Sequence, residues 1–264
     1  PTMHHAMFTL IKALADGVVW DNPLEDPKKK PWNTPEIVAN CLLVLTLDPH
    51  HENLTNWELL TKLCVHLGNL DEHVREWTVT YLTKWPKSSL TQTVTLLHKI
   101  INNQLLAHRP RVEAIVRNCT KFLEVIYHAN QRRSEATALD KSAFYNEAVN
   151  SGLDLNQQYF IWLHVVEYPE SWPNQFTFCN YPFVLDAASK SKIICYEAQI
   201  EQHQQLERAM LQSYLRLTTP SPYLVVCVRR DHIVLDTVQQ LTNKMDDLKK
   251  ALKIVFFNEA GIDA

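Results

Sequence analysis

Six cysteines are the side chains of this 264-residue sequence that could act as nucleophiles. They are Cys41, Cys64, Cys119, Cys179, Cys195 and Cys227. None belongs to a C-x-x-C pair and most lie in apolar surroundings, so we predict buried, reduced thiols. The segment around Cys179, from Asn146 to Ser189, contains no Lys or Arg. No neighbouring basic residue is therefore available to lower the pKa of the Cys179 thiol. We predict no catalytic residue in this chain.

Histidines and glycines give no cofactor or metal site. The pairs His4-His5 and His50-His51 lack the spacing of a zinc motif, and we predict surface histidines. The 4 glycines are too far apart for a Walker A loop or a G-x-G-x-x-G turn. The G-x-S-x-G and H-E-x-x-H motifs of hydrolases and metalloenzymes are absent from the sequence. The prediction is that the protein uses no cofactor.

Charge and composition argue against binding to nucleic acid or membranes. A net charge of −3 argues against a chain that coats nucleic acid or an anionic membrane. Aromatic residues cluster between Leu139 and Val184, but without basic residues to contact phosphates they predict packing. No apolar run reaches the length of a membrane span. We expect a cytoplasmic protein that binds neither nucleic acid nor membrane, and the nucleus remains an open alternative.

Amphipathic helices joined by short loops dominate residues 1–135. Apolar residues recur at helical spacing from Met3 to Trp20. Further helical segments begin near Pro35, Asn53, Asp71, Ser88 and Pro110. Gly68 is a stop signal at the end of one of them. Because no repeat of fixed period is present, the sequence predicts an irregular bundle or solenoid.

The middle of the chain mixes two predicted elements. Phe176 and Phe178 alternate with Thr177 and Cys179, which predicts a strand that leads into Pro182. From Ala187 to about Leu215, apolar residues three and four apart predict one long helix. His203 falls in that apolar stripe, so we expect it to be packed.

The last segment predicts a strand, a helix and a second strand. Ile254 to Phe257 is almost continuously apolar, and we expect this strand to be buried on both faces. Since a sheet needs more than two strands to stand alone, we expect a domain that continues beyond Ala264. Asp231 is the expected N-cap of the helix. Arg229 and Arg230 should be structural, pairing with a carboxylate or covering apolar surface.

This last segment resembles the start of the HECT domain, the catalytic domain of one class of ubiquitin ligases. The matching blocks are Val228-Arg229-Arg230-Asp231-His232, Asp247-Leu248-Lys249-Lys250 and Asn258-Glu259-Ala260-Gly261-Ile262-Asp263. Upstream, Phe144-Tyr145-Asn146 and residues 176–184 resemble the segment that precedes the domain. Structural signature residues implied by the resemblance are Arg229, Arg230, Asp231, His232, Leu248, Lys249, Lys250, Glu259, Gly261 and Asp263. The resemblance covers roughly the last half of the chain; residues 1–135 match loosely.

The resemblance implies a parent HECT-type ubiquitin-protein transferase. Such an enzyme accepts ubiquitin as a cysteine thioester from a conjugating enzyme and transfers it to a substrate lysine. Thr177-Phe-Cys-Asn180 holds the letters of the family's catalytic tetrad in another order, and we do not expect a nucleophile there. The resemblance places the catalytic cysteine beyond residue 264, so this chain alone should be inactive. Ubiquitin and the conjugating enzyme would contact those later parts, and an unknown substrate protein the helical region.

Together these expectations define the architecture. We predict a mainly α fold, an irregular helical bundle or solenoid followed by a long helix and the first strands of an α+β HECT N-lobe. Residues 1–135 form the helical pre-HECT region, 136–221 the aromatic-rich segment and linking helix, and 222–264 the incomplete start of the N-lobe. The long helix would dock against the catalytic domain, as in the family. The alternative is a non-catalytic helical protein-interaction module.

Overall fold

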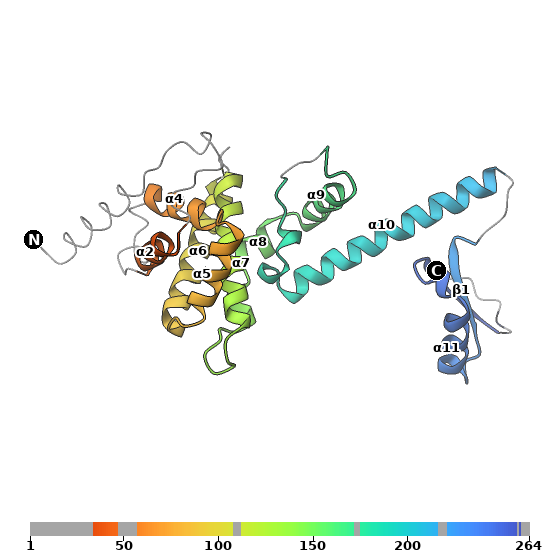
Figure 1. Cartoon of the computed structure of the whole chain (residues 1–264). Helices are drawn as coiled ribbons and strands as arrows, with labels where there is room; N and C mark the ends of the chain where they lie inside the picture. The colour runs from red at the N-terminus through yellow and green to blue at the C-terminus, as the bar shows by residue number, and fades with distance from the viewer. Residues whose placement is uncertain are drawn as a thin grey trace, which may run out of the picture. The chain divides into compact units, whose positions relative to one another are not determined.

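A computed structural model describes residues 34–46, 57–107, 112–171, 175–215, 221–257 and 259. The chain divides into two compact units between Ser189 and Lys190, and each has its own core (Figure 1). The helix expected from Met3 to Trp20 and both histidine pairs lie outside the described residues. Among the described helices, none combines the length and apolar character that crossing a membrane requires.

The first unit is built from helices. They are α2 (Pro35–Leu45), α4 (Trp57–Leu67), α5 (Glu72–Leu82), α6 (Lys87–Ala107), α7 (Val112–Gln131), α8 (Glu147–Gly152) and α9 (Leu155–Glu167). α7 packs against α4, α5 and α6 (Figure 1). Its apolar residues at Val116, Cys119, Phe122, Leu123 and Ile126 follow helical spacing and are all buried. The predicted irregular helical bundle is confirmed, and Gly68 directly follows the last residue of α4, as expected.

Packing of the first unit continues past residue 135. Asn130 on α7 binds the backbone of Leu139 twice, donating from Nδ2 to its carbonyl at 3.0 Å and accepting its amide at 2.7 Å. Tyr127 stacks on Phe183 with ring centroids 4.8 Å apart and meets Phe144 edge to face at 5.2 Å. Phe144 and Phe183 therefore contribute to the core against α7, as the lack of basic residues in this segment predicted, whereas Phe160 and Tyr168 are exposed.

The strand predicted around Phe178 is wrong. The segment forms two 3-10 turns instead, η2 (Phe178–Asn180) and η3 (Pro182–Val184). Thr177 fixes the first turn, because its hydroxyl accepts the Cys179 amide at 3.2 Å and donates to the Gln158 carbonyl at 2.8 Å. Local side-chain bonding of this kind competes with a sheet ladder. The alternation of apolar residues arises here from packing of a turn on α9.

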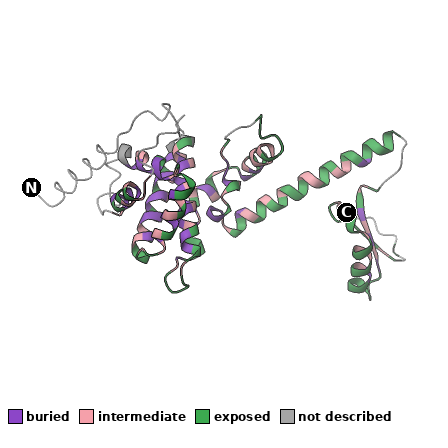
Figure 2. Cartoon of the chain, viewed as in Figure 1, coloured by how far each residue is buried: buried purple, intermediate pink, exposed green. Residues whose placement is uncertain are grey.

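The predicted long helix is confirmed as α10 (Ala187–Tyr214). Asp186 caps its start, where Oδ1 accepts the Ser189 amide at 2.7 Å. His203 is not packed as expected, since its side chain is 70% exposed and pairs with Glu207 at 3.2 Å. The two residues lie one turn apart on the solvent side of the helix. Figure 2 shows that most of α10 is exposed.

The second unit contains the predicted strand, helix and strand. β1 (Tyr223–Val228) pairs in parallel with β2 (Ala251–Phe256), and α11 (Ile233–Asn243) with the turn η4 (Met245–Asp247) makes the crossover. The register joins Tyr223 to Ala251 and Val228 to Phe256. Leu224, Val226 and Val228 are its buried core. The mainly α fold ending in the first strands of an α+β lobe is confirmed.

The expected burial of the second strand on both faces is not found. Leu252 is 59% exposed on one face of β2 and Val255 is 36% exposed on the other, so both faces remain open within the described part of the chain. The reason is topological: β1 is the one neighbour of β2 in this two-stranded sheet, and α11 packs against β1. The apolar character that indicated a buried strand is therefore exposed surface here.

Candidate functional site

The first arginine of the signature block holds the end of β1 to α11. Arg229 Nε and Nη2 donate to the carboxylate of Asp236 at 3.0 and 2.8 Å, and the Arg229 amide donates to the same carboxylate at 2.9 Å. The side chain of Asp236 is only 10% exposed. Hydrogen bonds from the Arg229 guanidinium and amide lower the pKa of Asp236 to about 2. The pair therefore makes charge-assisted hydrogen bonds to a nearly buried carboxylate, while the Arg229 side chain is half-exposed.

The second arginine reaches beyond β2. Arg230 Nε and Nη2 donate to the two carboxylate oxygens of Glu259 at 2.5 and 2.7 Å. Its guanidinium also lies 4.4 Å from the centre of the Phe256 ring. The hydrogen bonds from Arg230 lower the pKa of Glu259. Of the predicted signature residues, Arg230 and Glu259 thus connect the ends of the two strands, whereas Arg229 connects β1 to α11.

The expected cap at Asp231 is not formed. The N-cap position of α11 is His232, and no side chain bonds the first-turn amides there. Asp231 instead contacts the His232 ring, with Oδ2 2.9 Å from Nδ1, and this hydrogen bond lowers the pKa of Asp231. Because the helix begins one residue later than a cap at Asp231 would require, its carboxylate pairs with His232.

A polar stripe on α11 covers the outer edge of β1, and sequence reasoning missed it. Alternate residues of β1 direct their backbone groups to the edge opposite β2. Gln240 Oε1 accepts the Cys227 amide at 3.0 Å while its Nε2 donates to the Cys227 carbonyl. Lys244 Nζ donates to the Val225 carbonyl at 2.5 Å. Asp236 accepts the Arg229 amide in the same way. Residues 236, 240 and 244 therefore satisfy backbone hydrogen-bonding groups along an edge of β1 that would otherwise be unpaired. Their spacing of four was the signal in the sequence.

The other signature residues do not join this group. Lys250 pairs with Asp247 at 2.7 Å and Lys249 lies 3.6 Å from Glu201 on α10. Leu248 is half-exposed. Gly261 and Asp263 lie outside the described residues. The block 247–250 therefore forms the turn into β2, apart from the two arginines.

The cysteines are mostly placed as structural residues. Cys41, Cys64 and Cys119 are buried. Burial raises the pKa of Cys41 to about 11, while a hydrogen bond with Cys64 and burial raise that of Cys119. Burial also raises the pKa of Cys179. Cys195 departs from the prediction, since it is exposed on α10. A raised pKa opposes the thiolate that nucleophilic attack requires.

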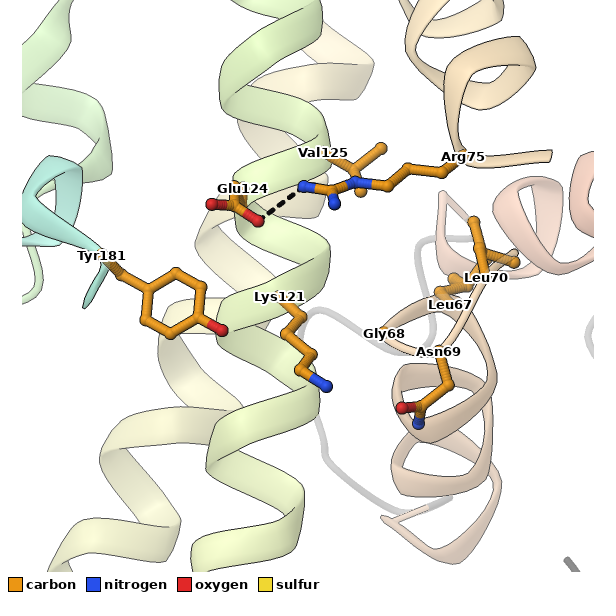
Figure 3. A pocket seen from close by; sticks show the side chains of 9 residues that line it. All are labelled: Leu67, Gly68, Asn69, Leu70, Arg75, Lys121, Glu124, Val125 and Tyr181. Carbon is orange, nitrogen blue, oxygen red and sulfur yellow. Dashed lines mark hydrogen bonds and ion pairs between the residues drawn. The ribbon is translucent and has the colours of Figure 1, made fainter. Parts of the chain in front are cut away.

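A polar pocket of about 330 Å³ lies in the first unit, between the α4–α5 loop, α7 and the aromatic segment (Figure 3). Its lining residues are Leu67, Gly68, Asn69, Leu70, Arg75, Lys121, Glu124, Val125 and Tyr181. No sequence motif marked it, because its residues come from three separate segments. Nowhere in the described ranges do three His, Cys, Asp or Glu side chains gather in a way that could hold a metal ion.

Comparison with known proteins covers both units. No family profile matches the chain. It is 27% identical over 240 residues to "Probable E3 ubiquitin-protein ligase mug30" of Schizosaccharomyces pombe, covering 84% of this chain and 28% of that protein. It is 26% identical over 264 residues to "Probable E3 ubiquitin-protein ligase HECTD2" of Mus musculus, covering 96% and 32%. It is 28% identical over 238 residues to "Probable E3 ubiquitin-protein ligase HERC3" of Homo sapiens, covering 85% of this chain and 20% of that protein.

The similarity therefore extends well beyond the signature blocks at the end of the chain. The chain spans about a third or less of the length of these curated relatives. The resemblance inferred from the arginine block is confirmed: over most of its length, the chain is similar to proteins named as probable E3 ubiquitin-protein ligases.

Proposed function

We propose that this chain is the helical region and the opening of the catalytic domain of a HECT-type ubiquitin ligase. The observation that carries the proposal is the similarity, over 84% and 96% of the chain, to proteins named as E3 ubiquitin ligases. The parent enzyme would accept ubiquitin on a cysteine and pass it to a substrate lysine. We expect it to work in the cytoplasm, with the nucleus as an alternative, and without a cofactor.

The catalytic cysteine of the proposed enzyme lies outside this chain. Support comes from the thiols described above, since Cys41, Cys119 and Cys179 have raised pKa values. The open apolar faces of β2 further support a lobe whose other parts cover them, because a two-stranded sheet is marginal by itself. The conjugating enzyme and ubiquitin would bind those other parts. The helical unit would hold the substrate protein.

A second function is a protein-interaction module without catalysis. The first unit favours it, because its helices bury a core of their own and leave a polar pocket at the surface. The two functions differ in what the remainder of the protein contributes, and the same helical unit would bind a partner in both.

A gel assay tests the absence of a catalytic cysteine. The chain is incubated with ubiquitin-activating enzyme, a conjugating enzyme, ubiquitin and ATP, and the products are separated without reductant. We expect no ubiquitin adduct on the chain. An adduct that reductant removes, and that disappears when one of the six cysteines is changed to Ala, would show that the chain itself carries the nucleophile. Exposed Cys195 is the first position to change.

A further inference from the structure

The polar pocket of the first unit is lined by a lysine, Lys121, whose charged group is not paired within the described ranges. Lys121 projects from α7 between Tyr181 and the loop at Gly68 and Asn69 (Figure 3). Within the described ranges, no hydrogen bond or ion pair involves its ammonium group. Arg75, in contrast, is engaged, because its Nη2 lies 2.6 Å from Glu124 Oε2. The Lys121 ammonium group is therefore available to a ligand, whereas the Arg75 guanidinium is already paired with Glu124.

Charges around the pocket sum to an excess of positive charge. The positive charges of Arg117 and Arg75 act on Lys121, and Glu124 is the carboxylate that acts on it in the opposite direction. Partial burial and then the charges of Arg117 and Arg75 lower the pKa of Lys121. Burial and the charge of Glu124 raise the pKa of Tyr181, so its hydroxyl remains a proton donor at neutral pH. An added anion would relieve the repulsion among the cations and would meet two donors.

The wall of the pocket is held rigidly in place. The backbone of Gly68 lies so close to α7 that an added Cβ would be 2.5 Å from the Asn118 carbonyl oxygen. Asn69 Nδ2 donates to Asn118 Oδ1 at 2.9 Å and to the Val65 carbonyl at 2.7 Å. Because these bonds fix the loop against α7, the pocket exists before any ligand binds, which lowers the cost of binding.

We propose that this pocket binds a carboxylate side chain of an acidic peptide segment in a partner protein. The carboxylate would accept from Lys121 Nζ and from the Tyr181 hydroxyl. Leu67, Leu70 and Val125 in the lining would contact its methylene groups. Phosphate is recognised best by free guanidinium forks, and the fork of Arg75 is already taken by Glu124. A single Lys charge suits a monoanion. The inference does not depend on ligase activity.

Nuclear magnetic resonance of the whole chain tests the proposal. The probe is acetyl-Ala-Glu-Ala-amide, and its neutral match is acetyl-Ala-Gln-Ala-amide. We expect the Glu peptide to shift the amide signals of Gly68, Asn69 and Leu70 saturably, and the Gln peptide to shift them little. Lys121→Gln should weaken binding about tenfold or more, since a charge-assisted hydrogen bond is lost. Lys121→Arg keeps the positive charge and should still bind the Glu peptide.

Controls separate the pocket from general attraction to lysines. Lys84→Gln removes the same charge from an exposed position in the turn after α5, outside the pocket lining, and should bind the Glu peptide like the unchanged chain. Equal binding by the Glu and Gln peptides, or by the chain with and without Lys121→Gln, overturns the proposal. Inorganic phosphate is a separate arm: saturable shifts with phosphate and none with the Glu peptide overturn the assignment to a peptide carboxylate.

Discussion

Arg229 and Asp236 are joined by three hydrogen bonds, two from the guanidinium and one from the Arg229 amide, at 2.8 to 3.0 Å. The pair connects the end of β1 to the first turns of α11. It continues into the bonds that Gln240 and Lys244 make along the same strand edge. We conclude that the signature arginine holds Asp236 in place, and that Asp236, Gln240 and Lys244 cover the free edge of β1.

Acid should weaken the second unit through Asp236. The folded-state pKa is lowered from 3.8 to about 2, so the stabilisation is fully present above about pH 4 and is lost as pH falls toward 2. Asp236→Asn should therefore destabilise the unit at pH 6, and the difference from the unchanged chain should shrink at pH 2.5. Hydrogen exchange of the amides at 224–228 measures this.

The matched control for that variant is Asp246→Asn, which changes the same chemical group at an exposed position of η4. It should leave exchange at 224–228 unchanged at both pH values. The difference in hydrogen exchange between Asp236→Asn and the unchanged chain should shrink from pH 6 to pH 2.5. If this difference stays constant, the assignment of the lowered pKa to this pair is contradicted.

Gly68 should be intolerant of a side chain. An Ala Cβ would meet the backbone of Asn118 at 2.5 to 2.9 Å, which backbone atoms cannot relieve without moving α4 or α7. We expect Gly68→Ala to lower the free energy of unfolding of the first unit by about 1–3 kcal/mol. Gly152→Ala is the control, because nothing lies within 4 Å of its added Cβ. Urea unfolding followed by circular dichroism compares them; equal loss in both variants would refute the close-approach explanation.

β2 should be the weakly protected strand. The core of its unit is three buried residues, and Leu252 and Ile254 are exposed, whereas α6 and α7 lie in the large core of the first unit. Amides at 252–257 should exchange faster than those at 89–107 and 112–126. Equal protection in a sample shown to be monomeric would mean that this strand needs no further cover.

The sequence predicted the elements well where a pattern was long. The helices between Pro35 and Gln131 and the helix α10 follow apolar spacing, so their existence was predictable, whereas α8 and α9 were not predicted. At Phe178 a short alternating run predicted a strand, but Thr177 and Pro182 impose turns that the apolar pattern does not reveal. His203 matched an apolar stripe by position, although its side chain lies in solvent.

The sites were less predictable than the elements. The arginine block was recognised as a signature and as a partner for carboxylates, but the partner Asp236 depends on where α11 starts and how it rotates. Gly68 was predicted as a helix stop. Its contact with the backbone of Asn118 is a tertiary contact between residues far apart in the sequence, so the sequence pattern did not predict it. The pocket joins residues from 67–75, 121–125 and Tyr181, and nothing in those separate stretches indicates that they meet.

A graft into a relative tests whether residues 223–259 can open a HECT-type catalytic domain. Residues 223–259 would replace the matching segment of the human ligase named HERC3, and formation of a reductant-sensitive ubiquitin adduct would be followed. We expect the graft to form the adduct. The same graft with Asp236→Asn should form less adduct, and the graft with Asp246→Asn should form as much as the unchanged graft. A folded graft without any adduct, beside an active unaltered relative, would contradict the proposal that this segment opens a HECT-type catalytic domain.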